Sequence, residues 1–145
     1  MADLVFGEVK VVYDNKDGTA NTVDVAKILE AKYGLFTAFY TLHENDIKQL
    51  LIDSLAGALE NLHMGGVAPA NPFDASMQKL QSMFRKFLFT GEVERMGIEG
   101  VPTQAALDGV SHRTKKKTYG HRRPSFIDTG TLELAFRSWI EGLLV

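Results

Sequence analysis

The chain has 145 residues, of which 45% are hydrophobic and 23% charged, the balance of an ordinary globular domain. That balance excludes a wholly disordered or fibrous protein, and the absence of cysteine excludes a disulfide scaffold, a thiolate metal site and a cysteine nucleophile. A formal net charge of −2 gives the molecule no overall attraction to nucleic acid.

The first predicted element is a β-strand over residues 4–13, where valines and a tyrosine alternate onto one face. The segment DNKDG at 14–18 follows and has the composition of a turn. We therefore expect a single domain over residues 1–145, with residues 1–20 forming an N-terminal strand or arm. A β-rich arm can add a strand to the sheet edge of a neighbouring subunit.

Helices are predicted for most of the next 70 residues. The first covers 23–33, with Thr22 as its cap and Gly34 at its end. Residues 35–42 have the composition of a strand but the surroundings of a helix, and helix is the preferred of the two. A central helix then runs from Asn45 or Asp46 to His63 with a wide apolar arc, which predicts burial on more than one side.

A one-sided amphipathic helix begins at Asp74, and a short strand near 92–99 and a short helix near 103–108 follow it. The apolar spacing of residues 131–145 predicts a C-terminal helix with Trp139 at its centre. The expected fold class is α+β, with central and C-terminal amphipathic helices packed on a small sheet and an N-terminal β arm. Two one-sided helices carry more aromatic surface than one small core needs, which predicts subunit-interface residues: Phe84, Phe87, Phe136 and Trp139.

Positive charge is concentrated between residues 112 and 123, in the sequence HRTKKKTYGHRR. This basic loop leaves the rest of the chain acidic, and it suits contact with a polyanion or with an acidic protein surface, although a solvated connection is the plainer alternative. No base-sequence readout is implied, because nothing places a helix in a groove of DNA. The candidate contact residues are Arg113, Lys115, Lys116, Lys117, Arg122 and Arg123.

The sequence contains no recognisable motif for catalysis or cofactor binding. The four histidines lack metal-ligand spacing, and the chain has no nucleophile elbow and no phosphate-binding glycine loop. The triplet Asp128-Thr129-Gly130 also occurs in aspartic proteases, but the basic segment before it and the helical pattern after it do not suit that site. We interpret it as the turn that begins the last helix, and we expect no catalytic, cofactor or metal site.

Residues 122–141 and 46–66 resemble parts of small virion-assembly proteins of tailed bacteriophages, of the neck, tail-completion and head–tail connector type. The motif is a basic, proline-containing loop, an Asp-Thr-Gly turn and a leucine-rich closing segment: Arg122, Arg123, Pro124, Asp128, Thr129, Gly130, Leu132 and Phe136. The resemblance implies a structural α+β subunit that forms a homo-oligomeric ring in the virion neck or tail, with portal, connector or tail proteins as neighbours.

Two functions therefore compete at the level of sequence. The preferred one is a virion structural protein, and the alternative is an accessory protein that binds nucleic acid nonspecifically through residues 112–123. The sequence shows neither a signal peptide nor an apolar run of about 18 residues, so we expect no membrane partner and assembly in the host cytoplasm.

Overall fold

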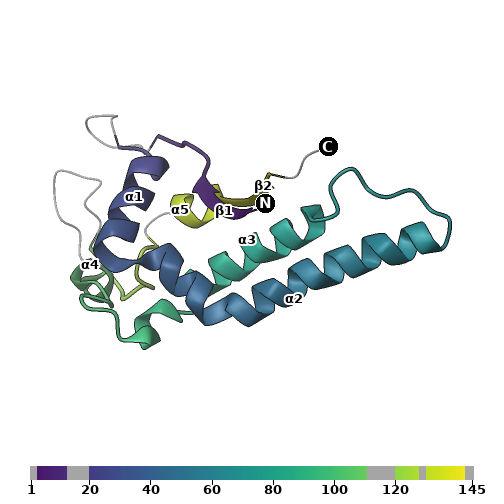
Figure 1. The fold of residues 1–145 in the computed structure, drawn as a ribbon. Helices are drawn as coiled ribbons and strands as arrows, with labels where there is room; N and C mark the ends of the chain where they lie inside the picture. The colour runs from purple at the N-terminus through teal and green to yellow at the C-terminus, as the bar shows by residue number, and fades with distance from the viewer. Residues whose placement is uncertain (1–2, 13–19, 111–119, 128–129, 143–145) are drawn as a thin grey trace.

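The computed structural model describes residues 3–12, 20–110, 120–127 and 130–142. Helices dominate this part of the chain, and two strands lie near its ends (Figure 1). The elements in chain order are β1 (Asp3–Glu8), α1 (Thr22–Tyr33), α2 (Leu35–His63), α3 (Asp74–Phe89), the 3-10 helix η1 (Val93–Met96), α4 (Gln104–Asp108), α5 (Thr131–Ala135) and β2 (Phe136–Glu141).

The sheet joins the two ends of the described chain. β1 and β2 pair antiparallel, with Leu4 opposite Ile140 and Phe6 opposite Ser138, so the purple and yellow ribbons of Figure 1 run side by side. The predicted α+β class and the N-terminal strand are confirmed. The strand is shorter than predicted, and it pairs within its own chain.

The prediction of a C-terminal helix is wrong for most of its length. After the five residues of α5 the chain extends as β2, in which Phe136 and Ser138 are buried while Arg137 and Trp139 are more exposed. Burial with a period of two is the pattern of a strand, and the same short run of apolar residues also satisfies a helical spacing. Backbone pairing with β1 decides between the two, and sequence periodicity carries no information about that partner.

The predicted strand near 92–99 is also wrong. Residues 93–96 form a 3-10 helix between Gly91 and Gly97, whose φ angles of +70° and +72° turn the chain on both sides. These left-handed conformations suit glycine, and they end the extended run that a strand would need. The short helix predicted near 103–108 is confirmed as α4.

The helical segments of the first half are confirmed, with two local differences. Residues 35–42 are helical and continuous with the central helix, so that α2 spans 29 residues. The cap of α1 is Asn21, whose Oδ1 accepts a hydrogen bond from the Asp24 backbone N–H at 3.1 Å. Thr22 is instead fully buried, where its Oγ1 donates to the Val9 carbonyl oxygen at 2.6 Å.

The core lies where the first half of α2, helix α3 and β2 meet. Four phenylalanines are fully buried there: Phe39, Phe84, Phe87 and Phe136. The rings of Phe84 and Phe136 stack with their centroids 4.1 Å apart, and the ring of Phe39 meets that of Phe84 edge-on at 5.2 Å. Such interlocked aromatic contacts fix how the sheet sits on the two helices.

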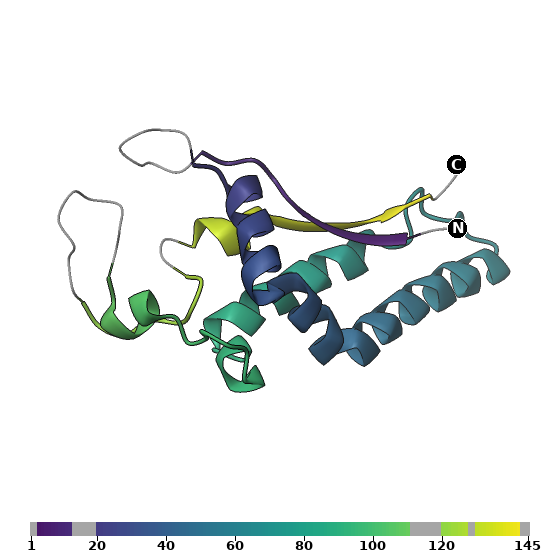
Figure 2. The same ribbon diagram turned by 60° about the vertical axis from the view of Figure 1, so that its left-hand side comes forward.

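The second half of α2 departs from this core. Ile47 is its last fully buried residue, and beyond it the helix packs on α3 along one side only. Figures 1 and 2 show this end of α2, with the connection to α3, extending past the part of the molecule formed by α1, α4 and the sheet. The prediction that the central helix is buried on more than one side is therefore wrong for its second half. Within the described ranges, none of the helices combines the length and the apolar character needed to cross a membrane.

Candidate assembly surfaces

An apolar stripe runs along the exposed side of the second half of α2. Its residues are spaced three, four and three apart, which places them on one face of a helix. We call this stripe the apolar ridge. Its members and their exposed fractions are Ile52 (58%), Leu55 (47%), Leu59 (65%) and Leu62 (48%).

The ridge is exposed because α3 packs on a different face of α2. The Ser76 hydroxyl donates to the Leu50 carbonyl oxygen at 2.9 Å and is hydrogen-bonded to the Ser54 hydroxyl. Successive residues of a helix are about 100° apart, so Leu55 and Leu59 point away from the side that carries Ser54. Nothing in the described part of the chain covers them.

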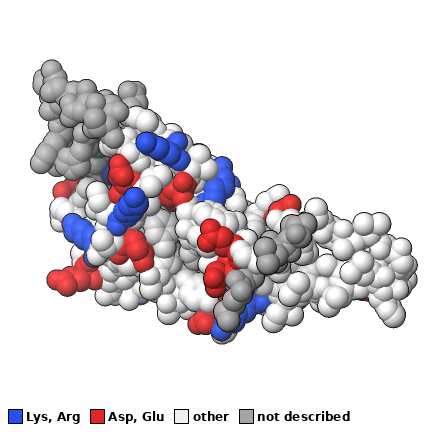
Figure 3. Space-filling view, turned by 45° about the horizontal axis from the view of Figure 1, so that its top comes forward, with Lys and Arg blue, Asp and Glu red and all other residues white. Residues whose placement is uncertain are grey.

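Small residues border the ridge on both sides, and acidic residues follow on one side only. Ala56 and Ala58 flank it, while Asp53 and Glu60 lie farther round the helix on one side. Residues 61–73, which follow, include no Lys, Arg, Asp or Glu. In Figure 3 the projecting end of the molecule is accordingly white, whereas red and blue side chains gather over the rest of this face.

A second apolar surface lies on the body of the molecule, between β1, α1 and the first turns of α2. We call it the apolar groove, and its volume is about 590 Å³. Glu30, on its wall, accepts hydrogen bonds from the Phe36 backbone N–H at 2.7 Å and from the Thr37 hydroxyl. The apolar residues that line the groove are Leu4, Phe6, Val23, Ala26, Phe36 and Tyr40.

Glu8 also lines the groove, and its carboxyl group is in an unfavourable place for a charge. Both carboxylate oxygens are buried, and neither has a hydrogen-bond partner among the described residues. Burial raises the pKa of Glu8 to about 8; the charge of Arg137 opposes this rise and that of Glu133 adds to it. The groove is therefore lined by a mostly protonated carboxyl group at neutral pH.

Replacing Glu8 with glutamine is expected to stabilise the protein at high pH. An acid whose pKa is higher in the folded state contributes its full stability below its unfolded pKa, and that contribution is lost as the pH rises towards about 8. Glutamine keeps the shape of the side chain without its negative charge, so Glu8→Gln should raise the free energy of unfolding by about 1–3 kcal/mol at pH 9, where the carboxylate is ionised, and change it little at pH 5. Urea unfolding at the two pH values measures this.

The exposed Glu141, on the other strand, provides the matched control. Glu141→Gln should leave the free energy of unfolding unchanged at both pH values. An effect of Glu8→Gln that is the same at pH 5 and pH 9 would contradict the raised pKa.

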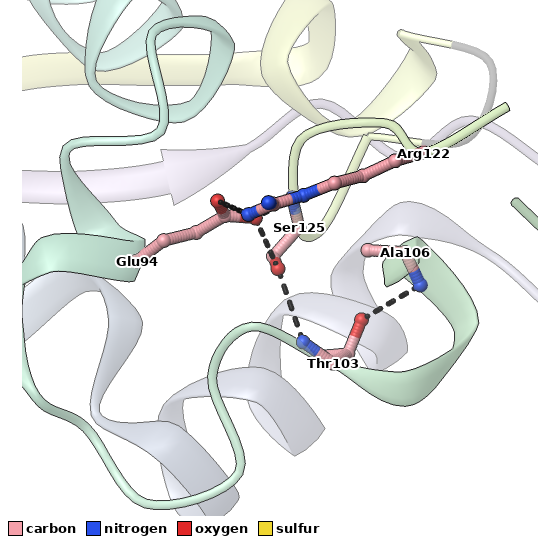
Figure 4. A network of polar contacts seen from close by, with 5 residues as sticks. All are labelled: Glu94, Thr103, Ala106, Arg122 and Ser125. Atoms are coloured by element: carbon pink, nitrogen blue, oxygen red, sulfur yellow. Dashed lines mark hydrogen bonds and ion pairs between the residues drawn. The ribbon is translucent and has the colours of Figure 1, made fainter. Parts of the chain in front are cut away.

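The C-terminal end of the basic loop is tied to the body by a polar network, drawn in Figure 4. Glu94 accepts hydrogen bonds from the backbone N–H and hydroxyl of Ser125 at 2.9 and 2.8 Å, and from Arg122 at 3.0 Å. The Ser125 hydroxyl also accepts from the Thr103 backbone N–H at 3.1 Å. Burial alone would raise the pKa of Glu94, but these hydrogen bonds and the Arg122 charge outweigh it and hold that pKa below its usual value.

The predicted contact residues of the basic loop are thus divided. Arg122 forms the ion pair with Glu94, and Arg123 donates from its guanidinium to the Val110 carbonyl oxygen at 2.9 Å. These contacts give both arginines a structural role at the base of the loop. The remaining four candidates, Arg113, Lys115, Lys116 and Lys117, lie outside the described residues.

The predicted subunit-interface residues are mostly wrong. Phe84, Phe87 and Phe136 are fully buried in the core of the single chain, so they have no surface to offer a partner. Trp139 is 41% exposed, and its ring covers Gly7 of the neighbouring strand. Of the triplet predicted to begin the last helix, Asp128 and Thr129 lie outside the described residues, and Gly130, with φ +81°, directly precedes α5.

The apolar ridge was not among the sequence-predicted site residues. Leu55, Leu59 and Leu62 belong to the apolar arc for which burial is predicted, and Ile52 lies beside that arc. The sequence holds no signal that separates an arc covered by its own chain from an arc covered by a partner, because both have the same helical spacing.

Metal ligation and similarity to known proteins add no further site. No group of three His, Asp or Glu side chains suited to a metal ion occurs in the portion of the chain that the structure describes. The sequence matches no protein-family model, and comparisons with curated proteins and with solved structures find no match. The two apolar surfaces are therefore interpreted from their own geometry.

Proposed function

We propose that this chain is a structural virion protein of a tailed bacteriophage. In this proposal it forms a homo-oligomeric ring in the neck or tail, with a role in tail completion or head–tail joining. It acts through contacts with copies of itself and with neighbouring virion proteins, and not by transforming a substrate. It would assemble in the host cytoplasm and remain in the virion.

The exposed apolar ridge is the observation that carries the proposal. Monomeric soluble proteins expose scattered apolar side chains, whereas a contiguous exposed apolar stripe is typical of a surface that a partner covers. The ridge also falls within residues 46–66, one of the two segments that resemble virion-assembly proteins. The exposed surface and the resemblance therefore concern the same helix.

A test of this function compares the wild type with a variant whose ridge is charged. The wild type is expected to sediment as an oligomer and to form closed rings in negative-stain electron micrographs. The double variant Leu55→Glu/Leu59→Glu should sediment as a monomer, because assembly would bury two carboxylates without partners. Its helical circular dichroism should be retained, since both positions are exposed in the single chain.

Phe89→Glu is the matched control. Phe89 is a large apolar residue that is 72% exposed, but it lies at the other end of the α2–α3 pair. This variant should assemble like the wild type. Wild-type protein that stays monomeric at its highest soluble concentration would contradict the proposed function.

A further inference from the structure

We infer that the apolar ridge of one copy seats in the apolar groove of the next copy. This inference rests on the proposed function, and it names the two surfaces that make the subunit contact. The contact is head-to-tail, because the ridge belongs to the second half of α2 while the groove lies between α1 and β1.

Ring formation requires two different surfaces on each chain. A contact in which the same patch faces itself gives a closed pair, whereas a ring needs one surface that is offered and another that receives. In Figure 1, α1 lies at the left of the molecule and the end of α2 at the right. Each copy can thus engage one neighbour through its ridge and another through its groove.

The chemistry of the two surfaces is complementary. The ridge presents aliphatic side chains at positions i, i+3, i+7 and i+10, the spacing by which an amphipathic helix anchors itself in a groove. The groove provides aliphatic and aromatic walls, and its volume of about 590 Å³ is within the range of roughly 300–1,000 Å³ that binding pockets occupy. In the groove, the aliphatic side chains of the ridge would contact apolar walls instead of water.

The charges beside the two surfaces also match. Asp53 and Glu60 flank the ridge on one side, and the exposed Lys27 stands on the wall of the groove. The groove's own acids do not compete for this lysine: Glu30 is bonded to the start of α2, and the Glu8 carboxyl group is buried. In a parallel pairing of two α2 ridges, by contrast, Lys48 at the start of the stripe would face its own copy.

Mixing two assembly-deficient variants tests the head-to-tail contact. The ridge variant is Leu55→Glu/Leu59→Glu, and the groove variant is Val23→Glu/Lys27→Glu, which changes only partly or fully exposed side chains of α1. Each variant alone should sediment as a monomer. An equimolar mixture should form dimers and grow no further, because only one intact ridge and one intact groove remain per pair. Dimer formation also shows that both variants are folded.

Other results of the mixing experiment would contradict the head-to-tail contact, the proposed function or both. A groove variant that assembles like the wild type, or a mixture that stays monomeric, overturns the head-to-tail contact while the proposed function stands. If the groove variant alone forms homodimers and the ridge variant alone stays monomeric, the contact is between two α2 ridges packed on each other. Wild-type protein that is itself monomeric would remove the proposed function as well.

A charge exchange gives a second, independent measurement. Lys27→Glu alone should raise the dissociation constant of the subunit contact about tenfold. Combining it with Asp53→Lys and Glu60→Lys should restore the wild-type value, because the same pairs meet with their signs reversed. No recovery would count against the proposed orientation of the ridge in the groove.

Discussion

Replacing Phe84 with alanine is expected to lower the free energy of unfolding by about 3–5 kcal/mol. Phe84 is fully buried, and its ring contacts those of Phe136, Phe39 and Phe36 at centroid distances of 4.1, 5.2 and 5.3 Å. The truncation leaves a cavity where α2, α3 and β2 meet. A domain of this size has a total stability of about 5–15 kcal/mol, so a large share would be lost.

Urea unfolding measures this effect as a lower midpoint with an unchanged slope. Phe89→Ala on the same helix is the control; its side chain is largely exposed, and the expected change is within about 0.5 kcal/mol. A Phe84→Ala protein of wild-type stability that no longer self-associates would return Phe84 to the subunit interface.

Replacing Glu94 with alanine is expected to cost about 2–3 kcal/mol at pH 7. The substitution removes the acceptor for the backbone N–H and hydroxyl of Ser125, which is fully buried, and it breaks the ion pair with Arg122. Because hydrogen bonds to a charged group are stronger than neutral ones, the loss should exceed that of one ordinary hydrogen bond. The segment joining the basic loop to α5 would also lose its attachment to η1.

The pH dependence of this effect has a definite sign. The pKa of Glu94 is lower in the folded protein, so the stability that the carboxylate contributes is present above its ordinary pKa of 4.5 and is lost as the pH falls through the folded value. The difference in unfolding free energy between wild type and Glu94→Ala should therefore shrink at acidic pH. Glu99→Ala, at an exposed position shortly after η1, is the control, and its effect on the unfolding free energy should not change with pH in this way. A difference that is constant with pH would contradict the role of the charge.

The parts of the fold that sequence predicts well are those whose causes are local. Asp24 in a first turn, Gly34 at a left-handed helix end and the one-sided apolar face of 74–89 are all written within a few residues of where they act. The sheet is different, because Asp3 pairs with Glu141 across almost the whole chain. No pattern within residues 131–145 shows that this segment pairs with β1, so the local sequence alone does not distinguish a helix from a strand.

The candidate surfaces depend partly on local sequence and partly on long-range packing. The four ridge residues are visible in the sequence as an apolar arc, but an apolar arc looks the same whether its own chain or a second chain covers it. The groove combines residues from β1, α1 and α2, and only the arrangement of these elements brings them together. The aromatic residues failed as interface candidates for the converse reason, because the single chain already buries three of them.

The antiparallel pairing of β1 with β2 has a consequence for synthesis on the ribosome. Leu4 and Phe6 leave the ribosome long before Ile140 and Ser138, the residues with which they pair. The groove wall formed by β1 is therefore held in place only after β2 has emerged, and nascent chains should lack a docking-competent groove until then. Such a delay would keep growing polypeptides from joining one another prematurely.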